Sequence, residues 1–414
     1  MGNINENKDN AVLNSTFDKS ERAIKLLFGS IFFVTGIILL VFSILYGLKT
    51  ENIIRNTVTG FLCGGILIYM LNDASVRGLF SYDNGQKRNR FVFSYYIGLI
   101  ISVFLPLVTP EIWPFMFIFL LLGLFSTNEI GLFSGSMLVM FAVLLEKEGG
   151  YAEFFIYFLT GVVILVLLRD LTETTKLGAP LFIVVSLLFM LLVAFDILFQ
   201  NRTFSLTMLI APLVNIIINL ILTLILLNIF GVYVIRKSND RYMDINDTEY
   251  PLLVQLKEKD KNAYFRAIHI AYLAERIALD LGLNARAVKT MSYYYKIGVI
   301  DGSKTWADVK HFYIENNFPQ EAVDYLKEYI ENDKSKPLSK ESAIIYMCET
   351  LIASINYLFE KDKDTKINYD ELIDKIFIHK MENKELYNYD ISLYEIERMK
   401  KLMKKEKLYY DFLR

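Results

Sequence analysis

The sequence predicts an all-α membrane protein in which a bundle of about eight transmembrane helices precedes a helical, water-soluble domain. Uncharged stretches recur between residues 26 and 235, among them 26–48, 91–110 and 203–235. Each can carry a helix across roughly 30 Å of hydrocarbon, and lipid cannot satisfy backbone groups left outside a helix. From about Arg236 the chain is polar, with apolar residues at helical spacing and no long alternating β-branched run.

Composition narrows the class further. The 414 residues are 54% hydrophobic and 14% aromatic, with a net charge of −2. This balance argues against nucleic acid as a main partner, which would require a basic domain. Cys63 and Cys348 lie in different halves and predict no disulfide framework. Residues 1–22 are polar and precede a span too long for a signal-peptide core, so we expect them to form a cytoplasmic tail.

We expect a transmembrane domain over residues 23–235. Its eight spans are predicted at 23–48, 56–71, 91–108, 112–125, 130–145, 152–168, 179–199 and 207–235. The fourth to sixth are short and suit the inside of the bundle or a locally thinned bilayer.

Basic residues set the predicted orientation. They gather before span one and after spans two, six and eight, at Lys19, Arg22, Lys25, Arg77, Lys87, Arg88, Arg90, Arg169, Lys176, Arg236 and Lys237. The opposite links 109–111 and 200–205 carry one basic residue at most, although 49–55 carries two. The positive-inside rule therefore predicts that both termini and the soluble domain are cytoplasmic, in the bacterial inner membrane.

A few polar residues interrupt the late spans. Asn215 and Asn219 are four residues apart on span eight and share a face, with Asn228 further along. They could line a polar path, but such residues more often hydrogen-bond to neighbouring helices. Asp196, near the end of span seven, is expected at the interface. Since no cluster of charges marks an ion relay, transport is disfavoured.

The soluble domain, residues 240–414, reads as a helical bundle. Ala267, Ile270, Ala271, Ala274 and Ile277 form one apolar stripe. Start and stop signals then predict helices at 263–280, 285–297, 320–329, 343–358, 369–381 and 393–404.

Several ordered motifs in this chain resemble the seven-transmembrane HD-domain phosphohydrolases, of the cyclic di-AMP phosphodiesterase type. They are Asn-Asp-Thr-Glu-Tyr-Pro-Leu-Leu at 246–253, Tyr-Tyr-Tyr-Lys-Ile-Gly at 293–298 and Phe-Pro-Gln-Glu-Ala-Val-Asp-Tyr at 318–325, together with 263–275, 339–344 and, in the membrane half, 106–114 and 230–232. The resemblance covers about residues 55–414. The extracellular domain that such proteins carry after the first span is reduced here to about residues 49–55.

The resemblance implies His and Asp ligands around divalent metals, which generate hydroxide for hydrolysis. In this chain those matched positions are Phe265 and Arg266 for a His pair, Tyr295 and Lys296 for the His-Asp pair, Thr305 for a further His, Tyr329 and Ile330 for a second His pair, and Glu349 for the last Asp. Only Glu349 keeps a carboxylate, and two positions hold cations. The resemblance therefore implies a degenerate HD domain with no metal, no cofactor and no catalytic residue.

Other side chains do not obviously replace the missing ligands. The chain has three His, namely His269, His311 and His379, and none is followed by Asp. We expect Glu349 to lie within ion-pair distance of Lys296 or Arg266, and to stabilise the domain strongly if that pair is buried.

Three functions remain open at this point. The first is an inactive membrane signalling protein that binds a cyclic dinucleotide or a protein partner, with the lipid bilayer around it. The second is an active cyclic di-AMP phosphodiesterase with an atypical metal site. The third is a membrane scaffold without a small-molecule ligand. Oligomerisation stays open in each case.

Overall fold

The structure, a computed structural model, describes residues 26–77, 79–85, 87–146, 150–169, 171, 177–199, 203–333, 335–361 and 366–411. The predicted tail 1–22, the start of the first span, and the basic residues Lys19, Arg22, Lys25 and Lys176 lie outside them. All regular elements of the described part are helices, and its one strand-like pairing is an isolated bridge between Leu338 and Tyr389. The predicted all-α fold is confirmed.

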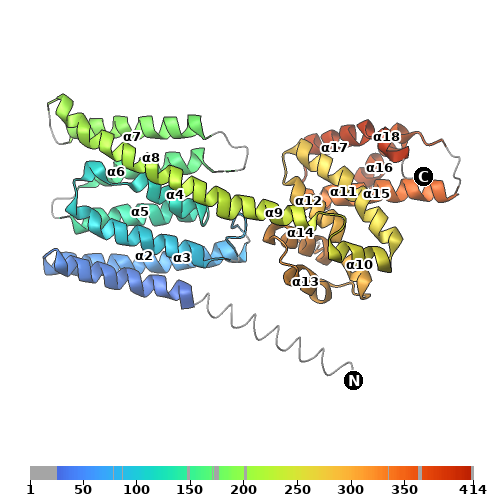
Figure 1. The fold of residues 1–414 in the computed structure, drawn as a ribbon, viewed down its shortest axis with the longest axis horizontal. Coiled ribbons are helices and arrows are strands. Elements are labelled where there is room, and N and C mark those ends of the chain that lie inside the picture. Colours follow the sequence, from blue (N-terminus) through green and yellow to red (C-terminus); the bar gives the residue numbers. More distant parts are fainter. Residues whose placement is uncertain are drawn as a thin grey trace, which may run out of the picture. The chain divides into compact units, whose positions relative to one another are not determined.

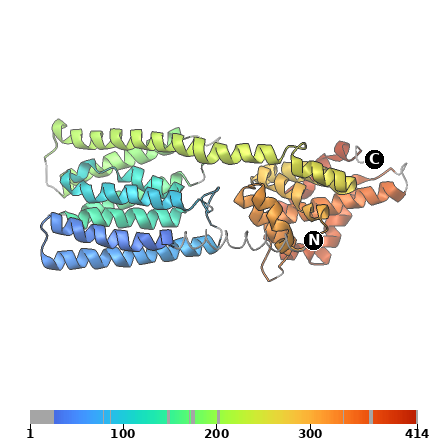
Figure 2. The same ribbon diagram turned by 60° about the horizontal axis from the view of Figure 1, so that its bottom comes forward.

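The chain separates into two compact units, residues 1–236 and residues 237–414. The first unit contains the helix Leu26–Leu45 and then α2 (Thr50–Val76), α3 (Asn89–Phe104), the 3-10 turns η1 (Leu105–Leu107) and η2 (Pro110–Ile112), α4 (Phe115–Leu124), α5 (Asn128–Leu145), α6 (Tyr151–Leu167), α7 (Gly178–Leu198), η3 (Leu206–Leu209), α8 (Ile210–Phe230) and the π-helical turn η4 (Gly231–Arg236). Its long helices run roughly parallel or antiparallel in both ribbon views (Figure 1) (Figure 2).

Seven described helices are long and apolar enough to cross a membrane. Six begin in the first unit, where the shorter apolar helices α4 and α6 complete the predicted order of spans. The seventh, Lys340–Lys361, belongs to the second unit and carries Glu341 and Glu349 on faces that pack inside that unit. We therefore assign it to the soluble part. The chain is an integral membrane protein.

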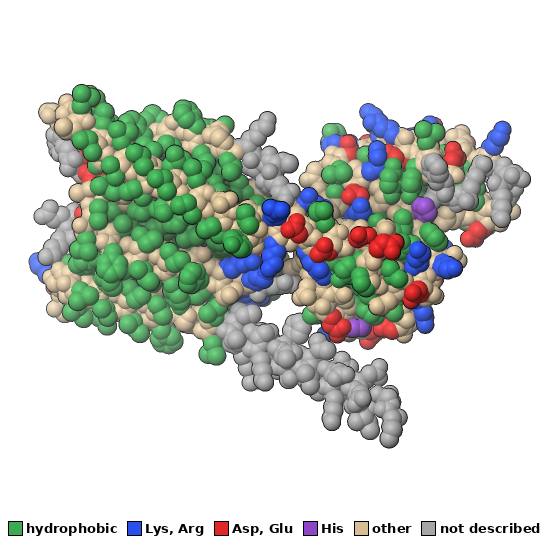
Figure 3. Space-filling view, in the orientation of Figure 1, with side chains coloured by type: hydrophobic (Ala, Val, Ile, Leu, Met, Phe, Trp, Pro, Cys, Tyr) green, Lys and Arg blue, Asp and Glu red, His purple; other side chains and the backbone are tan. Residues whose placement is uncertain are grey.

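Apolar side chains cover the outside of the first unit, as lipid contact requires, whereas charged side chains are spread over the surface of the second (Figure 3). Two polar residues of the late membrane helices differ in their burial. Asp196, near the end of α7, is fully buried among helices. Asn228 on α8 is exposed on the helix surface.

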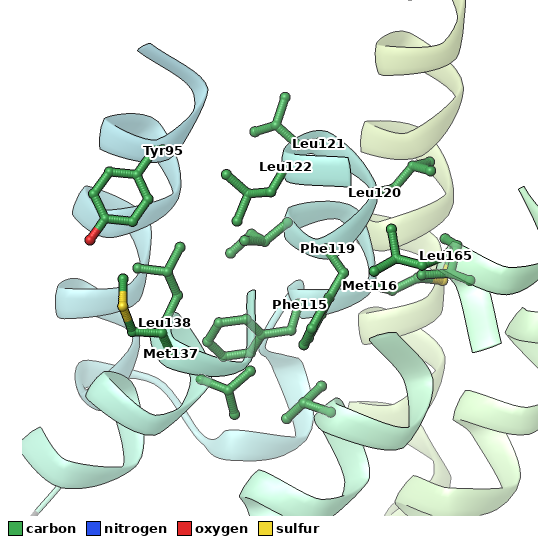
Figure 4. Close-up of a cluster of buried hydrophobic side chains, with 14 of the residues drawn as sticks. Tyr95, Phe115, Met116, Phe119, Leu120, Leu121, Leu122, Met137, Leu138 and Leu165 are labelled. Carbon is green, nitrogen blue, oxygen red and sulfur yellow. The ribbon is translucent and has the colours of Figure 1, made fainter. Parts of the chain in front are cut away.

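The short helix α4 forms the centre of the first unit. Seven of its side chains, including Phe115 and Phe119, are at most 6% exposed (Figure 4). Glycines on neighbouring helices let α4 come this close: a Cβ added to Gly161 of α6 would lie 2.5 Å from the Phe119 ring, and one on Gly135 of α5 would also clash with it. One aromatic ring thus packs against two glycine surfaces, which fixes the spacing of α4, α5 and α6.

The start of α4 is irregular, because Pro114 supplies no N–H and the chain before it forms the turns η1 and η2. The predicted span 112–125 is therefore helical only from Phe115. Asn215 Nδ2 donates to the carbonyls of Glu111 and Trp113 at 2.8 and 3.0 Å, and Asn219 Oδ1 accepts from the Phe117 N–H at 3.0 Å. These asparagines satisfy backbone groups that have no helical partner in an apolar unit. The packing interpretation of Asn215 and Asn219 is confirmed.

The second unit contains α9 (Lys237–Ile245), α10 (Pro251–Lys259), α11 (Lys261–Leu281), α12 (Ala285–Tyr294), η5 (Ile297–Ile300), α13 (Trp306–Glu315), α14 (Gln320–Glu331), α15 (Lys340–Lys361), α16 (Tyr369–Glu382), η6 (Glu385–Asn388), α17 (Leu393–Lys405) and α18 (Lys407–Tyr410).

α11 is the central helix of this unit and packs against α10, α12, α15 and α17. Its predicted apolar stripe is buried completely or almost so. Asp260 and Asn284 cap α11 and α12 by accepting backbone N–H groups, and Gly282 ends α11 with a φ of +75°. Two details correct the prediction. The helix expected over 285–297 ends at Tyr294, and α9, α10, α13 and α18 were not among the predicted helices.

Candidate functional site

The candidate site begins where α12 ends. Tyr295 is the C-cap residue of α12, and Lys296 precedes the turn η5. The following Gly298 has a steric role: a Cβ there would overlap the backbone oxygen of Ser303, so only glycine lets the loop return this closely. The chain therefore turns back tightly two residues after Lys296.

Three elements meet around a single carboxylate. Lys296 Nζ lies 2.5 Å from Glu349 Oε1 on α15, and Tyr329 on α14 donates its hydroxyl to Glu349 Oε2 at 3.0 Å. The expected ion pair is present. The Tyr295 ring lies edge-on to Tyr329 with centroids 5.5 Å apart, and Lys296 Nζ lies 5.1 Å from the Tyr295 ring centroid. Four side chains from the predicted positions therefore form one packed group.

The ion pair is only partly buried. The side chain of Lys296 is 36% exposed and that of Glu349 is 26% exposed. The strong stabilisation expected for a fully desolvated pair does not apply at this exposure, since water screens the interaction. The second contact of the carboxylate is the hydrogen bond from Tyr329, and a hydrogen bond to a charged group contributes about 1.5–3 kcal/mol.

Both phenols at the site remain protonated donors at neutral pH. Burial raises the pKa of Tyr295 and of Tyr329 far above the usual value, and the nearby charge of Glu349 raises both further. The positive charge of Arg266 acts in the opposite direction on the pKa of Tyr295.

The remaining predicted site residues differ from one another in burial and in contacts. Arg266 on α11 is half-buried, and its Nε is a buried atom without a hydrogen-bond partner. Its neighbour Phe265 is 51% exposed. Thr305 is exposed at the start of α13 and donates to Asp308 Oδ2 at 2.5 Å, while Ile330 packs on the edge of the apolar core. Thr305 and Ile330 have no contact with the carboxylate group among the described interactions.

The donor set at this site does not fit a divalent metal. Among the described residues, no group of three or more His, Cys, Asp and Glu side chains is placed to hold a metal ion. Glu349 is one carboxylate facing an ammonium group, with two phenols and a guanidinium nearby, whereas hard cations require several oxygen or imidazole ligands.

Each of the three histidines lies within hydrogen-bond distance of a residue outside this group. His269 Nδ1 is 2.7 Å from the Tyr409 hydroxyl, and burial lowers the pKa of its imidazole. His311 Nδ1 is 2.7 Å from the Asp308 carbonyl, and His379 Nε2 is 3.0 Å from Asn383 Nδ2.

A second group of acids was not anticipated. Glu341 is 8% exposed and accepts from the Tyr325 hydroxyl at 3.1 Å. Nearby, Glu321 accepts from Asn284 Nδ2 at 2.6 Å. Burial raises the pKa of both glutamates, and the two neighbouring charges, Glu341 on Glu321 and Glu328 on Glu341, raise them further. The amphipathic pattern of α14 placed Glu321 on a helix, but only tertiary packing puts it beside other acids.

Comparison with known proteins gives weak matches. No family model and no curated protein matches the chain. One solved structure, the HD domain of the L. monocytogenes phosphodiesterase PgpH in complex with cyclic-di-AMP, is 19% identical, with a TM-score of 0.32, over 39% of this chain and 97% of that one. A second structure of that HD domain is 19% identical, with a TM-score of 0.30, over 39% of this chain and 100% of that one. Scores this low assign neither a fold nor an activity to this chain.

Proposed function

We propose that this chain is a membrane signalling protein whose domain 240–414 has the scaffold of an HD phosphohydrolase and binds its ligand without hydrolysing it. The ligand is a cyclic dinucleotide; a protein partner is the alternative occupant. Two observations support the proposal: the ordered motifs from residue 246 onward, and the composition of the group around Glu349.

The ion pair of Lys296 and Glu349 carries the argument. Hydrolysis in an HD site requires a metal-bound hydroxide. Here the ammonium of Lys296 already lies 2.5 Å from the one carboxylate at the matched positions. A divalent cation brought to Glu349 would meet Lys296 and Arg266, and a like-charge contact at about 4 Å is unfavourable by roughly 1–4 kcal/mol. Positively charged side chains at these positions favour an anionic ligand and oppose the divalent metal that hydrolysis requires.

Metal analysis and turnover of the purified full-length protein test this proposal. We expect no stoichiometric transition metal and no product from cyclic di-AMP, with or without added Mn²⁺. Turnover that disappears in Glu349→Gln or His269→Gln, but persists in Glu360→Gln, would establish an atypical metal site and overturn the proposal. Absence of both turnover and any ligand or partner would favour the scaffold alternative.

We also propose that both termini of the membrane domain, residues 23–235, face the cytoplasm. The basic loop between α2 and α3 supports this orientation. Its cations are partly paired, as Asp83 contacts Lys87 at 2.6 Å and Arg90 at 2.5 Å. The positive-inside rule counts Lys and Arg and not net charge, so the pairing does not weaken it. A reporter fused after Arg236 should read as cytoplasmic, and a periplasmic reading would contradict the assignment.

A further inference from the structure

The last membrane helix, α8, carries a polar side chain on its outer surface. Asn228 is exposed there, and among the described residues its side chain has no hydrogen-bond partner. It lies about 12 Å along the helix from Arg236, the first cation after the span. The exposed side chains that follow it, Ile229 and Val232, are apolar. Since lipid tails offer neither donor nor acceptor, an amide in this surface indicates a polar partner outside the chain's own helices.

Asn228 belongs to a regular row of exposed side chains on α8. Its members alternate in steps of four and three residues, and they are Ile210, Val214, Ile217, Ile221, Leu224 and Asn228. The apolar members are 37% to 59% exposed. This spacing is that of the a and d positions of a heptad, where side chains of one helix pack between those of a parallel neighbour. The opposite face, with Asn215, Asn219 and Thr223, is buried against the chain's own helices. The row therefore has the geometry of a helix-pairing surface.

The row ends where the helix geometry changes. Its next position after Asn228 is Gly231, where an added Cβ would meet nothing within 4 Å. Gly231 begins the π-helical turn η4, and the following position in the row, Ile235, is buried. Because a π-helical turn contains more residues than an α-helical one, the sequence positions of the row rotate away from the outer surface. The open surface at Gly231 lets a second helix approach closely beside Asn228.

We propose that α8 pairs in parallel with α8 of a second copy of this chain along this row, with the two Asn228 side chains hydrogen-bonded to each other. A carboxamide has one acceptor oxygen and two N–H donors, so two of them satisfy one another. Copies inserted in the same orientation bring their α8 helices together in parallel, and a twofold axis along the membrane normal pairs identical positions. A single Asn at an a position fixes the register of such a pair. A purely apolar partner helix would leave the amide unsatisfied.

Energy transfer between copies in proteoliposomes tests the pairing. Full-length protein with a donor or an acceptor fluorophore fused after Arg414 is reconstituted at a fixed, low ratio of protein to lipid. We expect transfer that unlabelled wild-type protein abolishes by competition. Asn228→Leu should weaken association about tenfold, because it removes the hydrogen bonds between the two helices. Asn228→Gln keeps the same donors and acceptor and should retain most of the transfer. Tyr69→Phe, which removes an exposed hydroxyl from α2, should leave it unchanged.

Disulfide cross-linking in the same vesicles reads the register. Cys63→Ala removes the cysteine of the membrane unit, and Cys348 is fully buried in the second unit. In this background Leu224→Cys lies on the row and should give a covalent dimer on oxidation. Leu62→Cys, on the exposed surface of α2, is the matched control and should give far less.

Melting in dilute detergent, where copies are separated, distinguishes association from folding. Asn228→Leu should melt at the wild-type temperature, because the amide has no hydrogen bond among the described residues of its own chain. A clearly lower melting temperature would show a structural role for Asn228 and overturn the pairing. Absence of transfer in the wild-type protein, equal transfer in Asn228→Leu, or equal cross-linking at positions 224 and 62 would also overturn it. None of these results depends on ligand binding or turnover by the second unit.

Discussion

Replacing Glu349 by Gln tests whether one carboxylate joins α14, α15 and the end of α12. The change keeps the shape of the side chain and removes its charge. An ion pair as exposed as Lys296–Glu349 contributes about 0–1 kcal/mol, and a hydrogen bond to a charged group such as that from Tyr329 contributes about 1.5–3 kcal/mol. Since the amide oxygen can still accept a weaker bond, we expect a loss of about 2 kcal/mol. For a unit of this size, that corresponds to a drop in melting temperature of about 4–8 °C.

Thermal unfolding of the full-length protein measures this loss. In a Trp113→Phe background, Trp306 is the remaining tryptophan and its fluorescence reports the second unit. Glu360→Gln, an exposed acid on the same helix, is the matched control. A second substitution, Lys296→Met, should restore part of the stability, because it removes the cation left without its counter-charge. Equal, small shifts for Glu349→Gln and Glu360→Gln would refute the reasoning.

Three further changes test the packing and the buried acids. Gly161→Ala should lower the thermal stability of the detergent-solubilised protein, because its Cβ would meet a core ring at 2.5 Å, whereas Gly178→Ala, with nothing within 4 Å, should not; equal effects would contradict the packing argument. Asn219→Leu should cost about 1–3 kcal/mol by leaving a backbone N–H unsatisfied, and Asn228→Leu, on the exposed surface, should be near neutral in the same assay. Burial raises the pKa of Glu341, so the folded state binds its proton more tightly than the unfolded state. The residue therefore contributes stability below its ordinary pKa of 4.5, and this contribution is lost as pH rises through the raised pKa. Glu341→Gln should gain stability relative to wild type as the pH rises above 4.5, and a pH-independent difference would contradict this.

Much of the fold was predictable because its signals are local. Uncharged runs long enough to cross the bilayer identified the membrane helices, and the apolar stripe of α11 is a periodicity within one helix. The errors arose where local signals compete. Pro114 shortens the predicted span 112–125 at its start, and the helix expected over 285–297 stops at Tyr294, where the chain turns into η5. Asp196 carried no local sign that neighbouring helices would cover it.

The sequence by itself determined that this chain has a helical membrane part and a helical soluble part, and that cations stand at positions where the resembling family has metal ligands. Tertiary structure decided which of those side chains meet. Lys296 and Glu349 are 53 residues apart, and Phe117 and Asn219 are 102 residues apart, yet each pair forms a hydrogen bond. Helical periodicity follows from a few neighbouring residues, whereas contacts of this kind depend on how whole helices cross, which rests on the shapes of many side chains at once.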